Sequence, residues 1–246
     1  MDAGVRVVLA TGRRYRDTLG VAEAIGVRGP LVTASGALVK DSAGGHATLY
    51  RASFGAGVLE GVLGRIAARG HEAVVYTDSF SDGFDFHCAT ELSLEPGIRE
   101  YLELNRPVAR VVPDLHERPP AGAFAGFTMG SREAMDAVEE DLVSSWPDAL
   151  SLHVIRSPRY RHWMCEIAPA GVTKWSSVVR LAEGWGIEAA EICAVGDDVN
   201  DVPMLHGAGL GVAMGNATSE AIAAADRVAP TNDDGGVAAV VDWILA

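Results

Sequence analysis

The sequence has few cysteines, and their arrangement does not suit a structural role. The three cysteines, Cys88, Cys165 and Cys193, are odd in number, far apart and free of any C-x-x-C pair. This pattern excludes a disulfide framework and does not indicate a zinc site. We interpret all three as buried thiols.

Positive charge and long apolar runs are also scarce. The formal net charge is -13, so a polyanionic partner such as nucleic acid, or an anionic membrane surface, would be repelled. No apolar run approaches the roughly 20 residues that span a bilayer, and the first residues lack the basic region of a signal peptide. We therefore expect a cytoplasmic protein whose partners are small molecules or are bound through a cation. The sequence indicates no obligate protein partner.

What the sequence does contain is enough apolar residues for a substantial core, arranged in an α/β rhythm at both ends. Hydrophobic residues make up 48% of the chain. The pattern predicts a strand over Val5–Ala10, a helix over Arg14–Ile25 and a strand over Leu31–Val39; from Thr173 onwards strands and helices alternate again. Such alternation is typical of a parallel sheet with helical crossovers. The middle of the chain has an α+β pattern, which indicates an insertion into the sheet domain.

The first candidate site is an acidic loop, Gly196-Asp197-Asp198-Val199-Asn200-Asp201, directly after the apolar run Ile192–Val195. Turn chemistry explains part of it, with Asp201 as a helix N-cap and Pro203 in the first helical turn. Turn formation does not explain why several carboxylates lie close together in a loop that has no Lys or Arg, because like charges repel. Mg²⁺, which prefers oxygen ligands, would remove the repulsion.

Two further segments carry groups that suit an anion. In Leu9-Ala10-Thr11-Gly12-Arg13, a strand passes into a helix through a hydroxyl and a glycine, which directs free backbone N–H groups to one point. Lys174 follows the predicted N-cap Thr173, where the helix dipole disfavours a cation unless an anion lies nearby. Taken singly, each has an ordinary alternative: Thr11 as an N-cap, Gly12 as a turn residue and Lys174 as a solvated lysine.

Together, Val7–Arg13, Gly171–Lys174 and Val195–Leu205 resemble motifs two, three and four of the haloacid dehalogenase (HAD) superfamily, in the form found in Cof-type sugar-phosphate phosphatases. The similarity extends through 211–217 and 232–237. It implies a Rossmann-like core over residues 1–52 and 169–246, with an inserted α+β cap over 53–168 that selects the substrate.

The resemblance also implies roles for individual residues. Thr11, Gly12 and Lys174 would bind the phosphoryl group, and Asn200 would contact the phosphate. Asp197 would ligate Mg²⁺, with Asp201 as a supporting carboxylate. The activity implied is Mg²⁺-dependent hydrolysis of a small phosphorylated metabolite such as a sugar phosphate.

One signature of that family is not found in the sequence. Its attacking aspartate lies in a D-x-D-G-T motif about thirty residues before motif two, and motif two begins here within ten residues of Met1. The nearest imitation, Asp78–Gly83, lies in the expected cap and is interpreted as a surface turn. Either the true start lies upstream, which we favour, or the chain is a non-catalytic phosphate-binding remnant. In both cases we expect these 246 residues to be inactive as they stand.

Overall fold

The computed structural model describes residues 4–156 and 159–245. Its helices are α1 (Tyr15–Ala24), α2 (Val58–Ala68), α3 (Pro96–Asn105), α4 (Arg132–Ser145), α5 (Lys174–Trp185), α6 (Val202–Gly207), α7 (Ser219–Ala224) and α8 (Gly236–Leu245). Its strands are β1 (Leu9–Ala10), β2 (Pro30–Thr33), β3 (Leu38–Asp41), β4 (Ala47–Arg51), β5 (Ala73–Thr77), β6 (Phe86–Cys88), β7 (Ala109–Val111), β8 (Ala123–Gly130), β9 (Leu150–Ile155), β10 (Trp163–Pro169), β11 (Cys193–Gly196), β12 (Leu210–Ala213) and β13 (Arg227–Val228).

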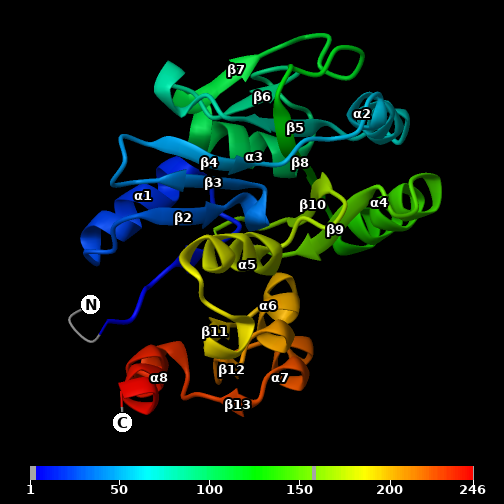
Figure 1. Ribbon diagram of the computed structural model, residues 1–246. Helices are drawn as coiled ribbons and strands as arrows, with labels where there is room; N and C mark the ends of the chain where they lie inside the picture. Colours follow the sequence, from blue (N-terminus) through cyan, green and yellow to red (C-terminus); the bar gives the residue numbers. More distant parts are fainter. Residues whose placement is uncertain (1–3, 157–158, 246) are drawn as a thin grey trace.

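The strands form three sheets; in Figure 1 most of the six-stranded sheet lies at the top, with β9 and β10 beside the middle sheet, and the three-stranded sheet lies at the bottom. The upper sheet has the order β7-β6-β5-β8-β10-β9, the middle sheet β1-β2-β3-β4 and the lower sheet β11-β12-β13. Pairing is parallel between β1 and β2 and throughout the lower sheet, whereas the upper sheet is mostly antiparallel. The fold is therefore mixed α/β with parallel sheets, as the sequence predicts.

The apolar segment 31–39 does not form the single strand that its pattern predicts. It forms β2 and β3, which pair antiparallel and are joined by the short 3-10 turn η1 (Ala34–Gly36). Ala34, Ser35 and Gly36 all have positive φ, and the Thr33 hydroxyl closes the turn by donating to the Leu38 carbonyl at 2.9 Å. Because both arms are apolar and buried, the pattern favours a single strand, although the Ser35-Gly36 pair between the arms is a turn signal.

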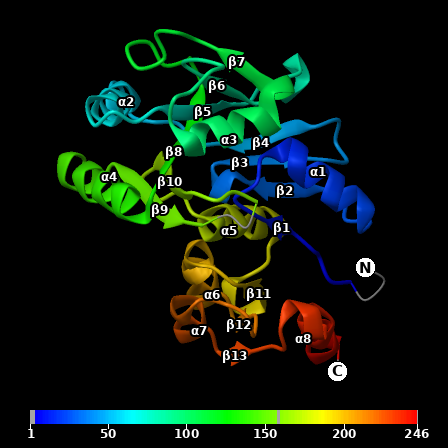
Figure 2. The same ribbon diagram turned by 180° about the vertical axis from the view of Figure 1, so that it is seen from behind.

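The first strand is shorter than the expected Val5–Ala10, because only Leu9 and Ala10 pair with β2. Val5 and Val7 are 42% and 47% exposed. In the part of the chain that the structure describes, β1 has a partner strand on one side only, and so does β11. The middle and lower sheets therefore each end in an open edge formed by a strand with a parallel partner. Figure 2 shows the extended segment leading into β1 from behind.

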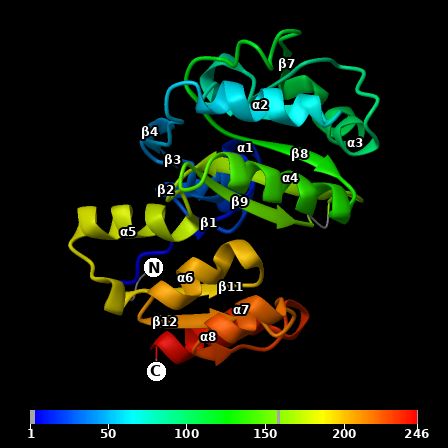
Figure 3. The same ribbon diagram turned by 90° about the vertical axis from the view of Figure 1, so that its right-hand side faces the viewer.

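Shared apolar cores fix the middle sheet against the upper one. Tyr15 and Ala22 of α1 pack in one cluster with Leu31 of β2 and with Phe124 and Ala125 of β8. The upper sheet is covered by α2 and α4 in a second cluster and by α3 in a third. Figure 3 shows these helices around the upper sheet.

Helix α5 connects the middle and lower sheets. It contacts η1 and β2 on one side and α6 on the other, as Figures 1 and 3 show. The backbones of η1 and the start of α5 approach so closely that a Cβ on Gly36 would lie 2.1 Å from the carbonyl oxygen of Thr173. The Ser177 hydroxyl also donates to the Gly36 carbonyl at 2.6 Å. The turn η1 is thus held against the N-terminus of α5, where Lys174 begins the helix.

Two minor expectations need correction. Asp78 is not part of a free surface turn, because it forms an ion pair of 2.6 Å with Lys40 in which both side chains are buried. Cys88 and Cys165 are buried as expected, but Cys193, on the open strand β11, is only partly buried. Among the helices that the structure describes, none is long and apolar enough to cross a bilayer.

Candidate phosphate-binding site

Lys174 is the centre of the candidate site. It is the first residue of α5, after a capping box in which the Thr173 hydroxyl accepts from the Ser176 amide and the Ser176 hydroxyl accepts from the Thr173 amide. The Lys174 side chain is only 8% exposed, and its Nζ donates to Asp201 Oδ1 at 2.7 Å and Asn200 Oδ1 at 2.8 Å. The alternative of a solvated lysine is therefore wrong.

The acidic loop is folded around Asp201. While Oδ1 faces Lys174, Oδ2 accepts from the backbone amides of Asp197 at 3.0 Å and Asp198 at 3.1 Å. A Cβ on Gly196 would lie 2.5 Å from the Asp201 Cβ, so this approach requires glycine. Part of the charge is thus neutralised by a lysine 27 residues earlier. The argument that the loop has no basic neighbour holds for the sequence but not for the fold.

Asp197 is the carboxylate whose ionisation is opposed by its surroundings. Burial raises its pKa, and the charges of Asp201 and Asp198 raise it further, while Lys174 acts in the opposite direction. A bound cation would relieve this repulsion. In the residues 4–156 and 159–245, no group of three or more His, Cys, Asp or Glu side chains is arranged to hold a metal. The oxygen donors fit Mg²⁺ only if water or a phosphate completes its coordination.

The turn after β1 reaches the same place. The Thr11 amide donates to the Val32 carbonyl at 3.0 Å, and the Thr11 hydroxyl accepts from the Arg13 amide at 3.2 Å. A Cβ on Gly12 would lie 3.7 Å from Asn200 Nδ2. The fold therefore brings the Thr11-Gly12 turn next to Asn200, which is itself bonded to Lys174, although these residues come from opposite ends of the chain.

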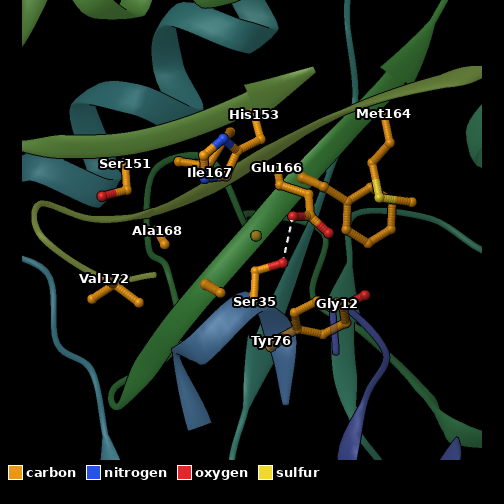
Figure 4. Close-up of a pocket in the computed structure, with 14 residues that line it drawn as sticks. Gly12, Ser35, Tyr76, Ser151, His153, Met164, Glu166, Ile167, Ala168 and Val172 are labelled. Atoms are coloured by element: carbon orange, nitrogen blue, oxygen red, sulfur yellow. Dashed lines mark hydrogen bonds between the residues drawn. The ribbon is translucent and has the colours of Figure 1, made fainter. Parts of the chain in front are cut away.

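Two residues at this site were not identified from the sequence. Ser35, in η1, accepts from Asn200 Nδ2 at 3.3 Å and donates from its hydroxyl to Glu166 Oε2 at 2.7 Å (Figure 4). The Ser35-Gly36 pair is a turn signal that the strand interpretation of this segment overlooks. Glu166 also carried a signal: it is the one charged residue in the run Trp163-Met164-Cys165-Glu166-Ile167.

A pocket lies beside this cluster, between the upper sheet and the loops of the middle sheet. Gly12 and Ser35 line one side of it, and Ser151, His153 and Glu166 line the other (Figure 4). Burial lowers the pKa of His153, and the nearby Lys174 charge adds to this effect, so both favour the neutral imidazole. The site thus joins a cation, an amide and a glycine turn to an adjacent cavity with polar walls.

Comparison with known proteins supports the resemblance seen in the sequence. The sequence pattern of the haloacid dehalogenase-like hydrolases matches residues 1–241. The phosphatase YwpJ of Bacillus subtilis is 25% identical in an alignment 271 residues long, gaps included, which covers 98% of this chain and 88% of YwpJ.

Solved structures agree. A haloacid dehalogenase-like hydrolase from Bacteroides thetaiotaomicron superposes with a TM-score of 0.77 and 26% identity, covering 99% of this chain and 88% of the other. The subclass IIB sugar phosphatase BT4131 has the same fold, with a TM-score of 0.76 at 19% identity over 98% of this chain and 86% of its own. The match over nearly the whole chain shows that this protein belongs to the haloacid dehalogenase-like hydrolase family.

Proposed function

We propose that this chain forms the phosphate-binding and Mg²⁺-binding parts of a phosphomonoester hydrolase that acts on a small phosphorylated metabolite such as a sugar phosphate. The observation that carries the proposal is the buried ammonium of Lys174, held between Asn200 and Asp201 beside the Thr11-Gly12 turn. Lysine is a compact point charge suited to phosphate. In this proposal Thr11, Gly12, Lys174 and Asn200 bind the phosphoryl group.

Mg²⁺ would be held chiefly by Asp197. Both oxygens of Asp201 already accept bonds, from Lys174 and from two backbone amides, so its part is to shape the loop and support the metal ligand. When bound, Mg²⁺ would neutralise charge on the phosphoryl oxygens. The protein's own contribution is to orient the phosphate by the Lys174 ammonium and the Asn200 amide.

We further propose that residues 1–52 and 169–246 form the core and 53–168 the cap. The upper sheet is built from residues 73–169, whereas the other two sheets come from the segments on either side of it. The pocket with Glu166 lies where these parts meet. A cap in this position would contact the group esterified to phosphate.

The attacking carboxylate is proposed to come from outside these 246 residues. Covalent phosphoryl transfer needs a nucleophile, and electrostatic stabilisation cannot replace it. Two carboxylates of the acidic loop already accept hydrogen bonds: Asp201 from Lys174, and Asp198 Oδ1 from the Val199 amide at 2.7 Å. The open edges of β1 and β11 support the entry of a further strand between them, with its carboxyl end at the phosphate site.

The experiment compares p-nitrophenyl phosphate hydrolysis by the 246-residue chain and by a version with a D-x-D-G-T strand fused before Met1, both with Mg²⁺. We expect negligible turnover by the first and Mg²⁺-dependent turnover by the second, abolished by Lys174→Ala or Asp197→Ala. Turnover of about ten per second by the short chain would contradict the proposal and point to Asp198 as nucleophile. If the fused chain binds inorganic phosphate without turnover, the alternative of a non-catalytic binding protein is favoured.

A further inference from the structure

Glu166 lies on a row of polar side chains that faces the candidate site. In the upper sheet it pairs in register with His153 of β9 on one side and with Phe127 of β8 on the other. Directly paired residues project from the same face of a sheet, and so do residues two apart in a strand, so Ser151 shares this face with His153 and Glu166. Figure 4 shows all three around the pocket.

This row begins next to the phosphate-binding residues. A Cβ on Gly12 would lie 3.1 Å from Glu166 Oε1, and Ser35 links Glu166 to Asn200 through two hydrogen bonds. A phosphate held by Lys174 and Asn200 would therefore place the carbon atoms next to its ester oxygen within reach of Glu166. The remainder of the molecule would extend along the pocket towards His153 and Ser151.

The surroundings of the Glu166 carboxyl favour a ligand that donates a hydrogen bond to it. Burial is the main cause that raises the pKa of the Glu166 carboxyl, and the Asp198 charge adds to it, while the Ser35 hydroxyl, the Lys174 charge and the Asn200 side chain act in the opposite direction. When ionised, the Glu166 carboxylate has about four acceptor positions, and the Ser35 hydroxyl fills one of them at Oε2. A buried polar group without enough partners is costly, so a ligand that donates a hydrogen bond here is favoured over one that does not.

We propose that Glu166 is a specificity-determining residue, which selects phosphate esters carrying a hydroxyl on the carbon adjacent to the esterified carbon and disfavours plain alkyl phosphates. This inference rests on the proposed phosphate site. A polyol chain would donate to the Glu166 carboxylate, whereas an alkyl chain would leave that carboxylate short of donors and displace water from it.

The test measures binding, so it does not depend on a nucleophile. Isothermal titration calorimetry on the 246-residue chain with Mg²⁺ would compare glycerol 3-phosphate with n-propyl phosphate, which has the same number of carbons and no hydroxyl. We expect a preference of roughly tenfold for glycerol 3-phosphate, the size of one hydrogen bond to a charged group. Glu166→Met should abolish or reverse it, Glu166→Gln should keep part of it, and the exposed control Glu60→Gln should keep all of it.

Inorganic phosphate separates this inference from the function on which it rests. Glu166→Met removes a negative charge near the phosphate, so it should bind inorganic phosphate at least as tightly as the wild type. If the wild type binds inorganic phosphate but does not distinguish the two esters, or if Glu166→Met still prefers glycerol 3-phosphate, the role of Glu166 is overturned and the proposed function stands. If inorganic phosphate does not bind, the phosphate site and this inference are overturned together.

Discussion

At the scale of single residues, the placement of charge is the main feature of this protein. The chain has only two lysines, Lys40 and Lys174, and the fold buries both in ion pairs with aspartates. A buried ion pair is weak evidence for stability, because desolvation opposes the Coulomb attraction. In the proposed function, the Lys174–Asp201 pair beside Asn200 and the Gly12 turn serves phosphate binding.

Removal of the Lys174 ammonium should be strongly destabilising. Lys174→Met keeps most of the apolar stem but leaves Asp201 buried without its counter-charge, so we expect a loss of about 3–5 kcal/mol in the free energy of unfolding. Urea denaturation measures it. The control Arg118→Ala removes a cation from an exposed pair with Asp114 and should change stability by less than about 0.5 kcal/mol. Equal effects would show that Lys174 is not paired as described.

Asp197 should make stability depend on pH. Because its pKa in the folded state is raised above the ordinary value of 3.8, the folded state binds more protons than the unfolded one. Stability contributed by the protonated form is therefore present below pH 3.8 and is lost as pH rises through the folded pKa. Asp197→Asn removes this loss, so we expect the variant to be more stable than the wild type at pH 7.

Urea denaturation at different pH values also provides the controls for this prediction. The advantage of Asp197→Asn in urea denaturation should shrink towards pH 4, where the wild-type carboxyl is increasingly protonated. The exposed control Asp82→Asn should show no such difference. Added Mg²⁺ should stabilise the wild type and not Asp197→Asn. An Asp197→Asn variant less stable than the wild type at pH 7 would contradict the repulsion inferred for the loop.

At the scale of elements, the contact between η1 and α5 sets the position of the site. Gly36 has φ of +101° and its α-carbon faces the Thr173 carbonyl, whereas Gly70, at the end of α2, has φ of +80° and no heavy atom near its missing side chain. The two glycines share the left-handed conformation and differ only in the close approach.

Alanine at these two positions should therefore have different effects. Gly70→Ala should destabilise by about 1 kcal/mol through backbone strain alone. Gly36→Ala adds a clash that must separate η1 from α5, so we expect a loss of more than about 2 kcal/mol and weaker binding of inorganic phosphate. Thermal unfolding and calorimetry measure the two effects. Similar losses for both variants would show that the contact between η1 and α5 can relax freely.

At the scale of the whole molecule, the open edges of β1 and β11 favour association of the chain with other copies of itself. Unpaired parallel edges with exposed Val5 and Val7 nearby are templates for pairing with another chain. We expect the 246-residue chain to associate in size-exclusion chromatography. Val7→Lys should reduce the association, because a charge on the exposed segment leading into β1 opposes pairing with another chain.

A helix position provides the control for this prediction. Val143, on α4, is 53% exposed, so Val143→Lys adds the same charge away from any strand edge. It should leave the association unchanged. A monomer with a cooperative thermal transition in the wild type would count against an incomplete sheet.

The sequence by itself determined the family, the α/β class and the elements whose signals are local. Helix α1 (Tyr15–Ala24) lies within one residue of the predicted Arg14–Ile25 at both ends, and Ser131 caps α4 by accepting from the Ala134 amide. Cap residues, glycines and apolar periodicity act within a few positions of the chain, so they are visible in it. The motif residues are visible for the same reason: their chemical groups occur in compact, ordered runs.

Only the tertiary structure decided which of these groups meet. The Lys174–Asp201 ion pair joins residues 27 apart, and the hydrogen bond between Ser35 and Glu166 joins residues 131 apart. The contacts of Glu166, the packing of η1 against α5 and the open edges of β1 and β11 likewise depend on the fold. The reason is physical: strand pairing and burial of charge depend on partners that are distant in the chain and that local patterns cannot specify.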